Sequence, residues 1–182
     1  MAAGLTANSS IWTLRYPETA VMPGAGPYAG KRLYVQRILV QFNTLTAFTT
    51  PVTAGRRIHL VRGAPTSATA SNPTGGAAYV MVRKRSDTAD ENLGVGRIAT
   101  TAALTTTGIT FETNKIRRLG LSHAGASGAE TSVEWRFDGV VADPIYLLPG
   151  ELLAIQAGAA DFDAAGTFEM VVDCDAVELV GV

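Results

Sequence analysis

The feature that most constrains the fold is a two-residue alternation of apolar and polar side chains. Residues 132–138 read Ser-Val-Glu-Trp-Arg-Phe-Asp, so an extended chain directs Val133, Trp135 and Phe137 to one side and the four polar residues to the other. This alternation is typical of an antiparallel strand with one buried face and one solvated face. Helical periodicity is almost absent from the sequence. We therefore predict an all-β fold.

The alternation recurs along the chain and predicts eight or nine strands. Residues 32–42 direct Ile38, Val40 and Phe42 inward, and residues 167–180 place their acidic side chains opposite their apolar ones. The other predicted strands are residues 11–16, 57–62, 79–85, 108–113, 145–148 and 151–157.

The connections between these strands indicate the fold class. Residues 64–76 and 86–96 are too long for hairpin turns and suit the crossovers of Greek-key or jelly-roll topology. We expect a short helical turn only in residues 114–121. A chain of 182 residues has the size of one domain. We predict an antiparallel β-sandwich of jelly-roll or Greek-key type over residues 31–182.

Residues 1–30 differ from the rest and are predicted to form an extended N-terminal arm. Three prolines and two glycines between Tyr16 and Pro27 oppose both a helix and a central strand. The apolar side chains of this region, Trp12 and Val21 among them, are costly to leave in water. We therefore expect the arm to dock, either on its own domain or on a neighbouring subunit.

The net charge of −1 conceals a strong separation of charge. Residues 19–86 contain nine basic residues and no acidic one, whereas residues 130–182 contain eleven acidic residues and one basic one. Strands from the two segments can alternate within one sheet, so that charges pair inside the monomer, or a basic face can meet the acidic face of a neighbouring subunit. The candidate interface residues are Ile11, Trp12, Leu14, Tyr16, Arg56, Arg57, Arg83, Arg85, Arg117 and Arg118.

No residue pattern predicts catalysis, a metal site or a cofactor. The two histidines, His59 and His123, lack further ligands at a metal-binding spacing. Cys174 falls on the apolar side of its strand, and residues 161–166 depart from a calcium loop at Ala165. We therefore expect a protein that is not an enzyme.

Charge and hydropathy also predict which partners are absent. The net charge argues against nucleic-acid binding driven by counterion release, and no window approaches the ~20 apolar residues of a membrane span. Residues 1–6 have neither the basic start nor the apolar core of a signal peptide. We expect synthesis in a cytoplasm and no direct contact with nucleic acid or membrane.

Three stretches together carry a resemblance to a known family. Residues 143–155 form a strand, a Pro149-Gly150 turn and a second strand, and residues 166–180 form a long final strand. With the Pro-Val-Thr-Ala-Gly-Arg stretch at 51–56, they resemble small β-sandwich virion proteins of tailed bacteriophages, and most of all the capsid decoration, or cement, proteins.

The resemblance implies a structural role in the virion, at the capsid surface. Its partners would be further copies of the chain, in a homotrimer, and the major capsid protein, and no cofactor would be needed. The alternative is a receptor- or carbohydrate-binding module of a fibre or spike head. Its candidate aromatic platform comprises Trp12, Trp135, Tyr34, Tyr79 and Tyr146, although Trp135 is expected to face the core.

Overall fold

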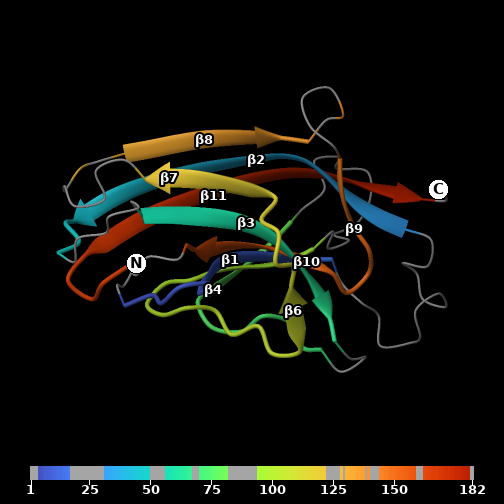
Figure 1. Ribbon diagram of the computed structural model, residues 1–182. Helices are drawn as coiled ribbons and strands as arrows, with labels where there is room; N and C mark the ends of the chain where they lie inside the picture. The colour runs from blue at the N-terminus through green and yellow to red at the C-terminus, as the bar shows by residue number, and fades with distance from the viewer. Residues whose placement is uncertain are drawn as a thin grey trace.

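The computed structural model describes residues 4–16, 31–49, 56–66, 70–81, 94–121, 128, 130–137, 139, 144–158 and 162–180. Within these residues the chain contains no helix, and its strands form two antiparallel sheets that face each other (Figure 1). The all-β sandwich prediction is confirmed. The strands are β1 (Ser10–Arg15), β2 (Lys31–Thr46), β3 (Arg56–Pro65), β4 (Ala77–Val80), β5 (Val95–Ile98), β6 (Ile109–Phe111), β7 (Arg117–Leu121), β8 (Glu130–Arg136), β9 (Ile145–Leu147), β10 (Leu152–Ala157) and β11 (Thr167–Val180).

The smaller sheet consists of four strands around the long strand β2. Strand β11 pairs with β2 on one side, and β8 and β9 pair with its other side at successive positions. Inward-facing residues of the three long strands meet in register, as in the row of Cys174, Ile38 and Trp135. The predicted inward face of β2 is confirmed, because Ile38, Val40 and Phe42 are buried in the core between the sheets.

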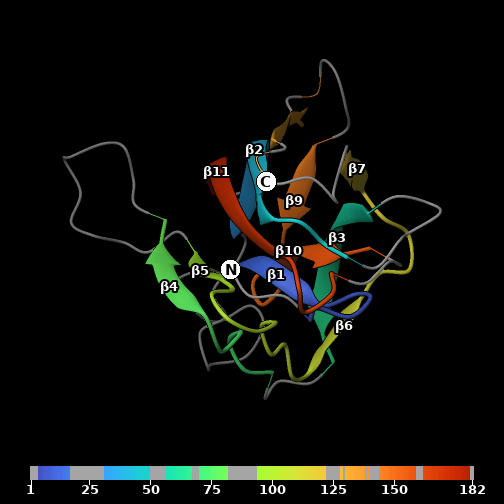
Figure 2. The same ribbon diagram turned by 90° about the vertical axis from the view of Figure 1, so that its left-hand side faces the viewer.

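The larger sheet has seven strands in the order β4-β5-β1-β10-β3-β6, with β7 also pairing with β3. Figure 2 shows this sheet with β4 towards one end and β6 towards the other. Every residue of β1 and β10 is buried, on both faces of the sheet. The face turned away from the other sheet carries a second cluster, in which Ile109 and Phe111 pack on Val61, Leu152 and Ala154. The centre of this sheet is therefore covered on both sides.

The segment at 114–121 was predicted as a helical turn, and this prediction is wrong. Arg117–Leu121 is strand β7, which pairs with β3 so that Leu119 lies opposite Ile58. Alternate residues are more buried, ending at the buried Leu121. Pairing with β3 therefore overrides the weak local preference of this short segment.

Strand β5 falls in a region predicted to be a connection. It is short and contains Gly96, which lowers its strand preference when the sequence is read alone. The position is occupied by a glycine because Tyr79 lies directly across from it, and a Cβ on Gly96 would meet the Tyr79 ring carbon Cζ at 2.0 Å. The ring of Tyr79 takes the space that a side chain would fill.

The Pro149-Gly150 turn is present, but it does not close a hairpin within one sheet. Gly150 has a φ of 90°, and the Glu151 amide donates to the Leu148 carbonyl at 3.0 Å. Strand β9 before the turn belongs to the four-stranded sheet, and β10 after it belongs to the seven-stranded sheet. The turn therefore carries the chain from one sheet to the other.

The N-terminal region contributes to the core. Strand β1 lies between β5 and β10, and Leu5 lies in the core between the sheets. Residues 17–30 lie outside the described residues, so the arm and its boundary at residue 30, like the jelly-roll connectivity, stay predictions.

The separated charges of the sequence meet in the structure. The basic strand β2 is hydrogen-bonded to β11, β8 and β9, all from the acidic segment. Ion pairs join the two segments: Lys31–Glu178 at 3.5 Å, Arg37–Asp175 at 2.7 Å and Arg56–Asp163 at 2.9 Å. These pairs favour the first interpretation of the charge pattern, in which opposite charges pair within one chain.

Candidate interaction surface

The face of the four-stranded sheet turned away from the core is the main exposed apolar surface of the described residues. We call it the outer face; it comprises the outward side chains of β2, β8, β9 and β11, together with Leu148, which follows β9. The large apolar side chains with high exposure in the described part all lie here: Leu45, Tyr146, Leu148, Val171 and Val177, at 37–50%. These side chains share one face of the sheet, which makes that face a candidate contact surface.

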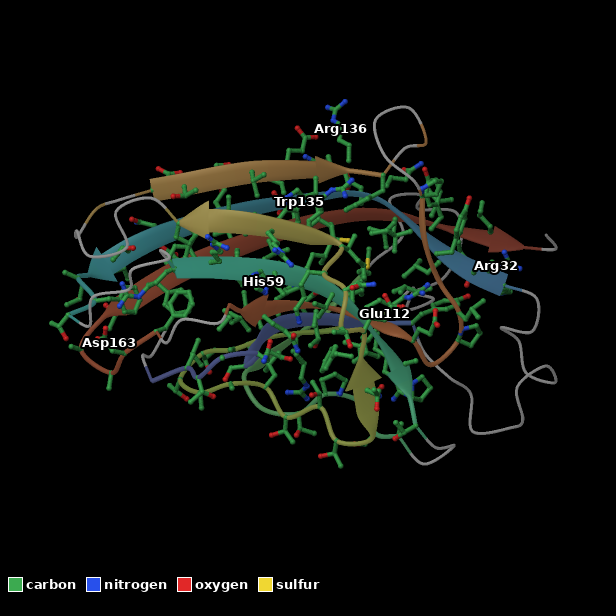
Figure 3. All side chains as sticks on the ribbon, viewed as in Figure 1. Arg32, His59, Glu112, Trp135, Arg136 and Asp163 are labelled. Carbon is green, nitrogen blue, oxygen red and sulfur yellow. The ribbon has the colours of Figure 1, made fainter. Side chains whose placement is uncertain are left out.

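Strand register places charged residues beside these apolar groups. Arg37 lies between Asp175 of β11 and Arg136 of β8, and its Nε donates to Asp175 Oδ2 at 2.7 Å. This hydrogen bond and the nearby carboxylate charge raise the pKa of Arg37 above its ordinary value. Arg136 donates to Glu134 at 3.0 Å, and Figure 3 shows Arg136 directed away from the molecule.

An acidic strip runs along β11 at the edge of the outer face. Glu169 and Asp173 are exposed and form no ion pair within the part of the chain that the structure describes. Val171 lies between them, on the same side of the strand. The strip therefore combines an exposed apolar side chain with carboxylates that form no ion pair among the described residues, although the charge of Asp173 contributes to the raised pKa of Arg37.

Two tyrosines lie side by side on the outer face. Tyr34 and Tyr146 are paired across β2 and β9, and their ring centroids are 5.2 Å apart with an interplanar angle of 28°. The Tyr34 hydroxyl donates to the Phe137 carbonyl, which fixes the inner ring of the pair. Tyr146 is the more exposed ring and offers an aromatic surface to a ligand.

The candidate interface residues of the N-terminal region are buried in this chain's own core. Ile11, Trp12, Leu14 and Tyr16 are at most 1% exposed, and the Tyr16 hydroxyl donates to Glu178 of β11 at 2.8 Å. They therefore join the two sheets and do not line a surface of the monomer.

The arginines predicted to lie in an interface differ in their burial and in the groups that they contact. Arg56 is buried against Asp163, with its guanidinium 4.6 Å from the centroid of the Phe48 ring. Arg117 lies 5.3 Å from the Phe137 ring centroid, and Arg57 and Arg118 are exposed on the seven-stranded sheet. Arg83 and Arg85 lie outside the described residues.

Sequence reasoning missed the outer face, although a signal for it is present. Val171 shares its side of β11 with Glu169 and Asp173, so it is an apolar residue at a position where alternation predicts a polar one. Leu45 and Val177 are exceptions of the same kind. Exceptions to a strand's alternation therefore indicate the surface better than the basic clusters do.

The structure shows the surroundings of the thiol and carboxylates that were weighed as chemical sites in the sequence. Burial, and to a lesser extent the charge of Asp175, raise the pKa of the Cys174 thiol to about 12. Asp163 pairs with Arg56 and also accepts from the Ala165 amide at 3.1 Å. Among the described residues, no group of three or more His, Cys, Asp or Glu side chains lies close enough to hold a metal ion.

No helix in the described part of the chain is long and apolar enough to span a membrane. The chain matches no family model, no curated protein and no solved structure.

Proposed function

We propose that this chain is a non-enzymatic structural virion protein that decorates and stabilises the outer surface of a phage capsid. The observation that carries the proposal is the difference between the two sheets. The centre of the seven-stranded sheet is buried on both faces, while the outer face of the four-stranded sheet exposes five large apolar side chains. The outer face is the surface that we assign to the shell contact.

The identity of the partner comes from the sequence resemblance, and the physical character of the outer face is compatible with it. A lattice protein adheres through area and shape, with apolar groups at the centre of the contact and polar groups around them. The outer face mixes both kinds of group, because Asp173 and Asp175 lie between Val171 and Val177 along β11. The proposal includes a homotrimer, since closed symmetric oligomers are common and a trimer matches a local three-fold axis of a capsid.

Co-sedimentation with empty capsids that lack the protein tests this proposal. The wild-type chain is expected to pellet with the shells at a fixed copy number. Val171→Asp combined with Val177→Asp should weaken binding about tenfold or more, because two buried apolar contacts are lost and like charges are added. Thr110→Asp, at an exposed position of β6, is the matched control and should bind normally.

Two results would oppose the proposal: no pelleting of the wild-type chain, or equal loss of binding in the double variant and the control. Thermal melting of each variant establishes that it is folded. If the double aspartate variant does not fold, Tyr146→Ser with Leu148→Ser tests the part of the outer face beside Val177.

A receptor- or carbohydrate-binding module is the second candidate, and the tyrosine pair favours it. Of the five aromatic residues in the candidate platform, Trp12 and Trp135 are buried, and the Tyr79 hydroxyl donates to the Thr13 carbonyl at 3.1 Å. Tyr34 and Tyr146 remain as a stacking surface. Glycan-array binding that is lost in Tyr146→Ala, without binding to shells, would support this candidate over the first.

A further inference from the structure

Basic residues gather around a buried histidine on the seven-stranded sheet, on the face turned away from the core. His59 of β3 lies opposite Arg118 of β7, and Arg57 follows the same face of β3. Lys115 precedes β7, and the positive charges of Lys115, Arg118 and Arg57 add to the burial of the ring in lowering the pKa of His59. Figure 3 shows where His59 lies on β3.

Two of these cations, Lys115 and Arg118, differ from the paired cations of the other sheet. Lys115 and Arg118 form no ion pair within the ranges of the chain described by the structure. By contrast, Lys31 and Arg37 each pair with a carboxylate of β11. Like charges held close together in a folded protein raise its energy, and an anion placed between them lowers it.

The buried polar atoms of the same row are also unpartnered. Gln156 of β10 lies opposite His59, so Gln156, His59 and Arg118 form one row across three adjacent strands. Gln156 Oε1 and His59 Nδ1 are buried and have no hydrogen-bond partner among the described residues, although these side chains are only 2% and 9% exposed. Leaving such groups unpaired costs free energy, which a bound polar ligand or water relieves.

We propose that the row of Gln156, His59 and Arg118, flanked by Lys115 and Arg57, is a binding site for an oxyanion. Arg118 and Lys115 donate charge-assisted hydrogen bonds to its oxygens, as cations do to carboxylates and phosphates. The protonated form of His59 becomes a further donor once the anion offsets the surrounding positive charge. A water or a protonated oxygen of the ligand donates to Gln156 Oε1, which accepts only.

The oxyanion has two sources with the same chemistry, a free ion or the carboxylate of a docked protein chain. The site lies on the opposite sheet from the outer face, so it does not depend on the proposed capsid contact. Neither Arg118 nor Lys115 belongs to the outer face or to the core between the sheets.

Titration followed by NMR tests the site, with the His59 ring signal assigned by its loss in His59→Gln. Inorganic phosphate, added at constant ionic strength against chloride, should shift this signal saturably and raise the pKa of His59. Arg118→Gln should weaken phosphate binding about tenfold or more, because one charge-assisted hydrogen bond is lost. Arg136→Gln, an exposed arginine of the other sheet, is the control and should change nothing.

A second titration uses a four-glutamate peptide in place of phosphate. Peptide binding that competes with phosphate identifies a docked carboxylate as the source, and phosphate binding alone identifies a free ion. The proposal is overturned if neither ligand shifts the His59 signal beyond the effect of chloride. It is also overturned if Arg118→Gln and Arg136→Gln bind phosphate as tightly as each other.

Discussion

At the scale of single residues, burial decides what each charged side chain does. Arg56 and Arg62 both belong to β3 and both pair with a carboxylate, but their side chains are 5% and 41% exposed. The guanidinium of Arg56 also lies over the Phe48 ring, which helps to compensate for lost hydration. Sequence alone shows two similar arginines and does not show which one is buried.

This difference predicts unequal effects of removing the two carboxylates. Asp163→Asn removes the carboxylate charge that pairs with the buried Arg56 and should reduce the free energy of unfolding by about 3 kcal/mol. Glu112→Gln breaks the exposed pair with Arg62 and should cost at most about 1 kcal/mol. Urea denaturation of both variants measures the difference, and equal costs would contradict this account of Arg56.

The Cys174 thiol should be nearly inert in the folded protein. With its pKa raised to about 12 by burial, the thiol holds roughly a thousandfold less thiolate at pH 8 than an ordinary cysteine. Labelling by a disulfide reagent should therefore be at least about thirtyfold slower in the native state than in urea, allowing for the greater intrinsic reactivity of a more basic thiolate. Equal rates in the two states would show that the thiol is not held in the core.

His59 predicts a loss of stability in mild acid. Burial and nearby cations lower the pKa of His59 from 6.5, so the unfolded chain binds the proton more readily than the folded one. The contribution is present above pH 6.5 and is lost as the pH falls from there through the folded-state pKa. Thermal melts in chloride should therefore show a smaller drop from pH 7 to pH 5.5 in His59→Gln than in the wild type. An equal drop would contradict the prediction.

At the scale of elements, the pairing of β4 with β5 depends on one glycine. Gly96→Ala would place a Cβ 2.0 Å from Tyr79 Cζ, so either the ring or the strand must move. We expect a loss of about 1–3 kcal/mol of stability, as for other overpacked sites. Gly120→Ala on β7 is the matched control, because nothing lies within 4 Å of its Cβ. Equal melting temperatures for the two variants would contradict the assigned packing.

Strands with strong alternation could be predicted from the sequence, and strands defined by their neighbours could not. The alternation of β2, β8 and β11 indicated their inward faces, because each has one buried side and one exposed side; the extent was predicted for β11, whereas β2 continues to Thr46, beyond the predicted end at Phe42. Strand β1 is buried on both sides, so its apolar residues suggested a docked arm. Whether the Pro149-Gly150 turn closes a hairpin depends on which sheet each of its flanking strands joins. The local sequence carries little of that information.

At the scale of the whole molecule, the two sheets serve different purposes in this account. The seven-stranded sheet is covered at its centre and bears the basic cluster around His59, while the four-stranded sheet has the bare outer face. The composition of the sequence indicated an assembly protein, but it placed the contact at the N-terminal region and the arginines. The outer face was missed because its apolar residues come from β2, β9 and β11, which are far apart in the sequence.

We propose that the outer face of the four-stranded sheet contacts the capsid shell. A reconstruction of empty shells decorated with the purified protein tests this most directly, because it shows which sheet faces the lattice. We expect β2, β8 and β11 to lie against the shell, with Val171 and Val177 in the contact. Density that turns the seven-stranded sheet to the shell, or shells that remain bare at saturating protein, would contradict it.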